Sequence, residues 1–137
     1  MEVTSALIVE EIRKHPDGRV DLLGLFEDFY VTGVPVAIEI FMLFLDLELH
    51  PDDKGRPHVL ELRLIDPDGR PVGPARPIRF DVPADADYPR STAQLDLPFG
   101  DVTFTAFGPH RLEVVIDGRV ARRLYLGVRP QQQRGAS

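Results

Sequence analysis

The chain has 137 residues, of which 43% are apolar and 28% are charged, and it contains no cysteine. This length fits a single domain that buries a core without covalent staples, and the lack of cysteine excludes disulfides, thiolate metal sites and cysteine nucleophiles. The formal net charge of −6 argues against general nucleic-acid binding, and no apolar run reaches the ~20 residues of a membrane-spanning helix.

The charge is unevenly distributed along the chain. Residues 1–68 carry 15 acidic and 6 basic residues, whereas residues 69–137 carry 7 acidic and 10 basic residues. Such asymmetry can orient two copies of a protein or a partner, although a solvated surface is the simpler interpretation. Because no signal peptide precedes the structured sequence and arginine far outnumbers lysine, as in G+C-rich genomes, we expect a cytoplasmic, bacterial protein.

Three Asp-Gly pairs predict hairpin turns, since this dipeptide readily supplies the positive φ that tight turns require. They lie at residues 17–18, 68–69 and 117–118. The first predicts a hairpin of residues 3–14 and 19–29, and the third a hairpin of residues 111–116 and 119–128. The second ends a predicted strand at residues 59–65.

Alternating apolar and polar residues predict the remaining strands, at residues 36–49, 78–82 and 93–97. Residues 2–14 also have tolerable helical spacing, but their β-branched side chains favour a strand. About eight strands separated by turn-rich gaps predict an all-β protein, an antiparallel β-sandwich, with a barrel as the alternative. We expect one domain at residues 1–128 and a flexible polar tail at residues 129–137.

The closing segment at residues 107–118, Phe-Gly-Pro-His-Arg-Leu-Glu-Val-Val-Ile-Asp-Gly, is followed by Leu-Tyr-Leu-Gly-Val at residues 124–128. It resembles the end of many bacterial immunoglobulin-like domains, although Gly108-Pro109-His110 replaces their usual Pro-Gly-aromatic pattern. Residues 1–7, 22–26 and 64–69 resemble a family of uncharacterised bacterial proteins of about this length. The resemblance implies an immunoglobulin-like sandwich and no particular activity.

The best candidate for a metal site is the segment that joins His50 to His58, because a hairpin could bring the two imidazoles together. The intervening Pro-Asp-Asp-Lys-Gly is ordinary turn sequence, so we expect an exposed polar loop without metal. Three aspartates could offer oxygen ligands to Ca²⁺, although they lack the pattern of an EF-hand loop: Asp81, Asp85 and Asp87. We expect no metal and no other cofactor.

Catalytic and nucleic-acid-binding patterns are weak. Ser91 and His110 could join an aspartate in a triad, but no Gly-x-Ser-x-Gly motif surrounds Ser91, so we expect no enzyme. A basic cluster lies near the last strand, without interleaved aromatic residues or a basic domain charge. It comprises Arg111, Arg119, Arg122 and Arg123, and we interpret it as an outward face that binds no nucleic acid.

The strand at residues 36–49 is the most informative segment, because its first part is apolar on both faces. One predicted face holds Ala37, Glu39, Phe41, Leu43, Leu45, Leu47 and Leu49. The other begins with Ile38, Ile40, Met42 and Phe44. A sandwich strand needs only one apolar face, so Ile40, Met42 and Phe44 require a second cover. Residues 22–30 of the same chain or a second subunit could provide it.

These features favour a non-enzymatic interaction or assembly module that contacts a protein partner or itself, a homodimer being the simplest self-association. We expect no membrane partner. The alternative function is binding of a small molecule or carbohydrate by loops at one end of the sandwich. The chain has no tryptophan for a sugar platform, and its tyrosines are Tyr30, Tyr88 and Tyr125.

Overall fold

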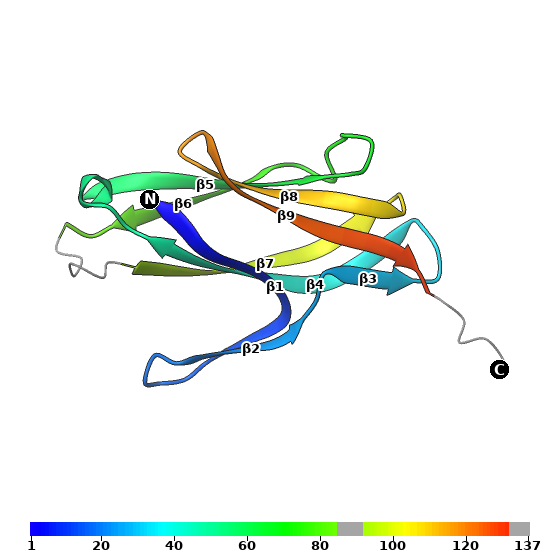
Figure 1. The fold of residues 1–137 in the computed structure, drawn as a ribbon, viewed down its shortest axis with the longest axis horizontal. Helices are drawn as coiled ribbons and strands as arrows, with labels where there is room; N and C mark the ends of the chain where they lie inside the picture. Colours follow the sequence, from blue (N-terminus) through cyan, green and yellow to red (C-terminus); the bar gives the residue numbers. More distant parts are fainter. Residues whose placement is uncertain (85–91, 132–137) are drawn as a thin grey trace.

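The computed structural model describes residues 1–84 and 92–131, which form nine strands in two packed sheets (Figure 1). Strands take up 70% of these residues, and the helical content among them is one 3-10 turn at Pro51–Asp53. The predicted all-β sandwich is therefore confirmed, with nine strands in place of about eight. No helix in this part of the chain is long and apolar enough to cross a bilayer.

The first sheet has the order β2-β1-β4-β7, and all its strand pairs are antiparallel. Its strands are β1 (Glu2–Lys14), β2 (Val20–Leu25), β4 (Val36–Glu48) and β7 (Thr92–Phe104). The second sheet has the order β3-β9-β8-β5-β6. Its strands are β3 (Asp28–Val31), β5 (Arg56–Ile65), β6 (Arg76–Val82), β8 (Gly108–Ile116) and β9 (Arg119–Pro130).

The pairing of β3 with β9 is parallel, so the expectation of a wholly antiparallel sandwich is wrong at this edge. The chain leaves β2 at Leu25 and enters the second sheet at Asp28, beside the last strand. The predicted second arm of the first hairpin is therefore divided between the two sheets. β9 itself continues through Arg129 and Pro130, which pair with Tyr30 and Val31.

The three predicted turns form where Asp-Gly lies. Gly18 and Gly69 have φ angles of 92° and 85°, and their N–H groups donate to the carbonyls of His15 and Asp66. In the last hairpin both Asp117 and Gly118 have positive φ, as the tight turn between β8 and β9 requires.

The core lies between the sheets and includes Phe41 and Leu43 of β4, as predicted. Phe41 stacks on Phe99 of β7, with ring centroids 4.8 Å apart. The expected placement of Ala37 and Glu39 on this face is wrong, since both are exposed. Val36 and Ile38 pack against the core instead.

The alternation of β4 changes where it passes Asp101 of β7. Asp101 has a φ of 53°, which is not a strand conformation. Ile38 pairs with Val102 on one side of this irregularity and Ile40 pairs with Gly100 on the other. The side chains consequently exchange faces between residues 38 and 41 of β4 and between residues 99 and 102 of β7.

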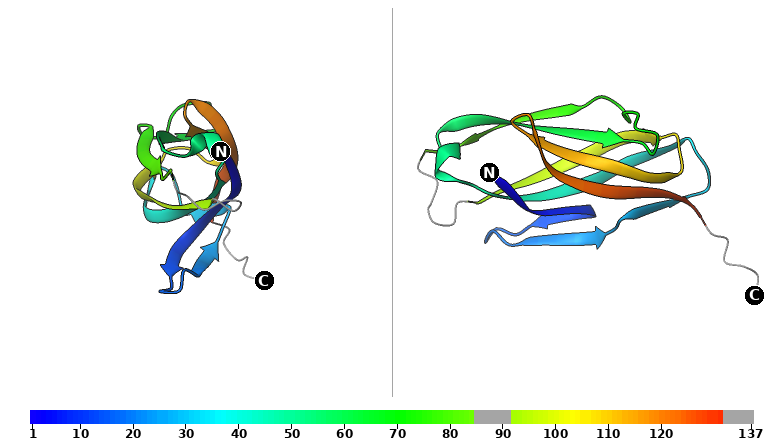
Figure 2. Two further views of the ribbon diagram at one scale, coloured as in Figure 1. Left: turned by 90° about the vertical axis from the view of Figure 1, so that its left-hand side faces the viewer. Right: turned by 45° about the horizontal axis from the view of Figure 1, so that its top comes forward.

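The β1–β2 hairpin bends away from the sandwich (Figures 1 and 2). β1 pairs with β4 up to Val9 and thereafter pairs with β2 alone. At the bend Gly24 has a φ of 70° and lies against Glu10, since a Cβ at Gly24 would be 2.8 Å from Glu10 Cγ. Only glycine combines that conformation with so close an approach at little cost.

The bent hairpin covers part of the outer face of the first sheet. Lys14 Nζ lies 2.8 Å from Oδ2 of Asp96, and Asp96 pairs with Phe44 in the register of β4 and β7. Ile12 is two residues from Lys14 and pairs with Leu22, so these two apolar side chains share the face that looks toward Phe44. Phe44 is accordingly only 8% exposed.

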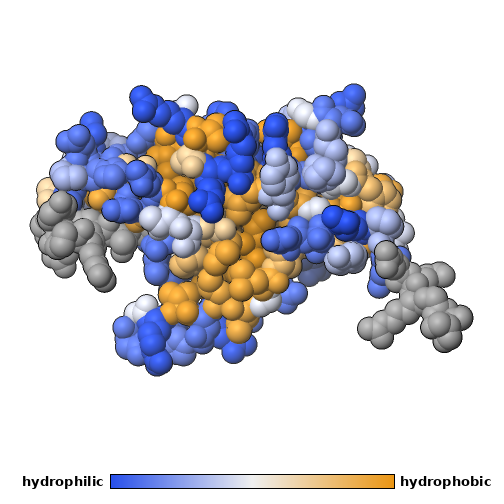
Figure 3. Space-filling model, in the orientation of Figure 1, coloured by the Kyte–Doolittle hydropathy of each residue, from blue (hydrophilic) through white to orange (hydrophobic). Residues whose placement is uncertain are grey.

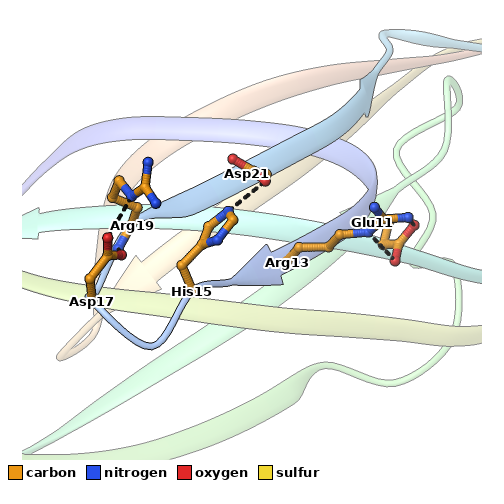
Figure 4. Close-up of polar contacts among 6 residues, drawn as sticks. All are labelled: Glu11, Arg13, His15, Asp17, Arg19 and Asp21. Carbon is orange, nitrogen blue, oxygen red and sulfur yellow. Dashed lines mark hydrogen bonds and ion pairs between the residues drawn. The ribbon is translucent and has the colours of Figure 1, made fainter.

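The tip and far face of the hairpin are charged (Figure 4). His15 Nε2 lies 2.7 Å from Asp21 Oδ2, and Arg19 Nε donates to Asp17 Oδ2 over 2.7 Å. Exposed pairs of this kind contribute little to stability, but they keep the projecting hairpin solvated.

Candidate interaction surface

One side of the sandwich is open, because neither of its bordering strands is fully paired. β2 joins β1 only from Val9 onward, and β3 joins β9 only from Gly127 onward. Within the described chain, residues 2–7 of β1 and residues 119–126 of β9 each have an edge without a neighbouring strand. A groove with a volume of about 1330 Å³ runs along this side, between the two strands.

Apolar and aromatic side chains line much of this groove. In Figure 3 the apolar area is visible as the orange surface beneath β9, over β1 and β2. The apolar lining includes Leu7, Leu25, Phe26 and Leu124. Tyr30, Phe107 and Tyr125 also line it and are 61%, 41% and 68% exposed. A contiguous exposed patch of this kind is typical of an interaction site.

The β9 side of the groove is positively charged. β9 holds four arginines and no acidic residue. Arg123 Nε donates to Glu113 Oε2 over 2.9 Å, and Arg129 Nε donates to Asp28 Oδ1 over 3.0 Å. Arg122 lines the groove and forms no ion pair with the described residues. The predicted basic cluster thus lies on β9, with Arg111 joining it from β8, opposite Tyr125.

The three residues predicted as an interface lie in three different environments. Phe44 is buried by its own chain, Met42 is half-buried, and Ile40 is 60% exposed. Phe44 is therefore covered by its own chain, which was one of the two expected covers, the other being a second subunit. A contact of Ile40 and Met42 with a second subunit stays a prediction.

We expected His58 to lie in an exposed loop, and this expectation is wrong. His58 is 3% exposed and packs on Phe80. Its Nδ1 lies 2.6 Å from Asp117 Oδ2, and its Nε2 lies 2.8 Å from the carbonyl oxygen of Asp53. Both ring nitrogens are thereby engaged by protein oxygens. His50, the other histidine of the predicted metal site, has its Nε2 3.8 Å from Oε1 of Glu2. No group of three or more metal-ligating side chains occurs in residues 1–84 and 92–131.

Two opposing effects act on His58. Burial lowers the pKa of its imidazole, but hydrogen bonds to Asp117 and to the Asp53 carbonyl, together with the negative charges of the Asp117 and Asp53 carboxylates, outweigh burial and raise that pKa. Burial likewise raises the pKa of Asp117, while the hydrogen bonds from His58 and from the Val59 N–H lower it overall. The pair is therefore a structural ion pair that ties β5 to the β8–β9 turn.

Two of the residues considered for catalysis or for Ca²⁺ binding, His110 and Asp81, lie within the described part of the chain. His110 is fully buried, its Nδ1 donates to the carbonyl of Gly108 over 3.0 Å, and its ring meets the edge of Phe104. It is a core residue. Asp81 is exposed. Four further candidates lie outside the described residues: Asp85, Asp87, Tyr88 and Ser91.

A model of a family of unknown function, DUF6941, matches residues 4–129. The chain belongs to the DUF6941 family. The matched region begins within β1 and ends within β9, so the DUF6941 domain comprises all nine strands. No curated protein matches this DUF6941 chain. The expectation of a family without assigned function is confirmed, whereas the immunoglobulin-like and bacterial parts of the resemblance stay predictions.

Sequence reasoning missed the groove as a whole. Its elements come from opposite ends of the chain, since Leu7 and Leu25 belong to the first hairpin and Tyr125 to the last. A local signal was present in β9, where arginines and a tyrosine occupy positions between inward-facing apolar residues. The open edges could not be inferred from that signal, because they depend on where β2 ends and β3 begins.

Proposed function

We propose that this protein is a non-enzymatic, cytoplasmic protein-binding module of a bacterium, and that its partner docks in the groove between β1 and β9. The observation that carries the proposal is the combination of strand edges that no described strand pairs with and the exposed Leu25, Tyr30 and Tyr125. Unpaired main-chain groups offer hydrogen bonds and the apolar lining offers burial. The engaged nitrogens of His58 and the buried His110 support a role without catalysis.

The proposal is tested with a displayed library of random peptides about ten residues long, the upper end of ordinary strand length. The library is selected on the wild type, on a variant with Leu25→Ser and Tyr125→Ser, and on Val59→Ser. Val59 is 41% exposed on β5 and does not line the groove, so it is the matched control. We expect binders to the wild type and to Val59→Ser that fail to bind the groove variant. Binders that ignore the groove variant, or no binders at all, would contradict the proposal.

Carbohydrate binding is the second candidate, favoured by the exposed Tyr30 and Tyr125 in one groove. The two rings lie on strands β3 and β9, not on loops at one end of the sandwich. A soluble oligosaccharide panel screened on the same variants discriminates between the candidates. Saturable oligosaccharide binding that is lost on Tyr125→Ser, without peptide binding, would replace the first proposal with this one.

Self-association is the third form of interaction, supported by the exposed Ile40 beside Met42. If a second copy covers this face, the wild type is a dimer by light scattering and Met42→Glu is a folded monomer. A monomeric wild type would remove this form and leave the groove as the binding surface.

A further inference from the structure

We infer that the groove takes an extended acidic segment of a partner protein, which adds as a strand to the free edge of β9. This inference rests on the proposed function and specifies the partner. Strand addition is a common mode of peptide recognition, in which main-chain hydrogen bonds supply affinity and alternate side-chain positions supply specificity.

The main-chain groups of β9 show which residues would pair. The N–H of Gly127 donates to the carbonyl of Glu27, and the N–H of Gln131 donates to the carbonyl of Val31. Odd-numbered residues here therefore direct their main-chain groups toward β3, since these groups alternate along a strand. Arg123 and Tyr125 continue the series beyond the start of β3. Their N–H and C=O groups thus face the groove without a strand partner in the described chain.

The charge of this edge selects an acidic occupant. Arg119 and Arg122 form no ion pair with any described residue, and the charge of Arg123 is partly neutralised by its ion pair with Glu113. The acidic groups that line the groove, Glu27 and Asp28, lie at the β3 end, where Arg129 holds Asp28. The unpaired part of β9 is therefore positive within a chain of net charge −6, and an acidic strand complements it.

The same charges disfavour two other occupants. A second copy joined edge to edge through β9 would place Arg122 and Arg123 close to the same arginines of its partner, because a two-fold interface repeats one surface. Like charges placed together suppress such pairing. A nucleic acid would meet the arginines favourably but would be repelled by the acidic remainder of the protein.

The alternating geometry also defines the side chains of the acidic segment. Residues of the added strand that face the apolar lining would meet Leu7, Leu25 and Leu124, with Arg122 at the end of this face, and the residues between them would lie by Arg123. An extended segment with alternating apolar and acidic residues therefore fits the groove best.

The test uses the peptides selected on the wild-type protein. We expect these peptides to be rich in acidic residues and to lose at least about tenfold in affinity on Arg122→Glu, as a charge reversal beside the ligand predicts. The matched control is Arg79→Glu on β6, the opposite edge strand of the same sheet, where Arg79 is exposed and forms no ion pair with any described residue. This control should retain wild-type affinity, and raising the salt concentration should weaken the wild-type complex.

Peptide backbone methylation tests strand addition directly. In a selected peptide, N-methylation of one set of alternate residues should abolish binding, and methylation of the other set should leave it, since only one set donates to β9. The inference would be overturned if methylation of either set left binding unchanged, if the selected peptides were neutral or basic, or if Arg122→Glu did not change their affinity. If such peptides still require Leu25 and Tyr125, the proposed function survives. A β9-mediated dimer, or oligothymidine bound in place of peptide, would overturn both.

Discussion

The buried pair of His58 and Asp117 should make a measurable contribution to folding. His58→Ala removes two hydrogen bonds and the packing of the ring on Phe80, whose centroid is 5.5 Å away. The Asp53 carbonyl then loses its imidazole donor. The Asp117 side chain is 48% exposed, so water replaces part of its lost contact. We therefore expect the free energy of unfolding to fall by about 2–3 kcal/mol.

The pH dependence of this loss identifies its cause. The pKa of His58 is raised in the folded protein, so its stabilisation is complete below the pKa of an unfolded histidine, about 6.5, and is lost as the pH rises through the folded pKa. The pKa of Asp117 is lowered, so its stabilisation is complete above about 3.9 and is lost as the pH falls through the folded pKa. The stability difference between wild type and His58→Ala should be largest between these two values.

Urea unfolding followed by far-UV circular dichroism measures this difference, at about pH 5.5 and about pH 9. His50→Ala is the control, since the His50 side chain is 45% exposed and its removal should change stability by no more than about 0.5 kcal/mol. A loss for His58→Ala as small as that of the control would show that the His58–Asp117 pair does not stabilise the fold. A difference that grows with pH would show that the ring is buried in its neutral form.

Three further substitutions test the packing. Phe44→Ala should lower the free energy of unfolding in urea by about 3 kcal/mol, because the hairpin buries this side chain. Ile40→Ala, at an exposed position, should lower it by no more than about 0.5 kcal/mol. Equal losses would show that the hairpin does not cover Phe44. Gly127→Ala should lower the melting temperature, because its Cβ would overlap the Asp28 carboxylate that Arg129 holds. Gly33→Ala, where a Cβ meets no atom of the described residues within 4 Å, should melt like the wild type. An equal effect of the two substitutions would count against the contact between Gly127 and Asp28.

Much of the sandwich could be predicted from local patterns. Each Asp-Gly pair forms its turn because the required φ angles are a property of the dipeptide itself. Phe41 and Leu43 lie in the core because alternation places them on one face of a strand. Such features depend on neighbouring residues, so they can be read from a sequence without knowing the fold.

The remaining features depend on residues distant in the sequence. The conformation of Asp101 changes which faces of β4 and β7 are buried, and no pattern in residues 36–41 indicates it. His58 is polar and follows a turn, but the carboxylate that permits its burial comes from Asp117, 59 residues away. The division of the first hairpin's second arm between two sheets likewise requires the edge of β9, which is formed by the end of the chain.

Amide hydrogen exchange at Arg123 and Tyr125 tests the binding edge of β9 most directly. In the free protein we expect fast exchange at these two amides and slower exchange at Leu124 and Leu126, whose main-chain groups face β8. A selected acidic peptide should slow exchange at Arg123 and Tyr125, as its strand pairs with them. Strand addition at β9 would be contradicted by slow exchange at both amides before any peptide is added, or by unchanged fast exchange in the saturated complex.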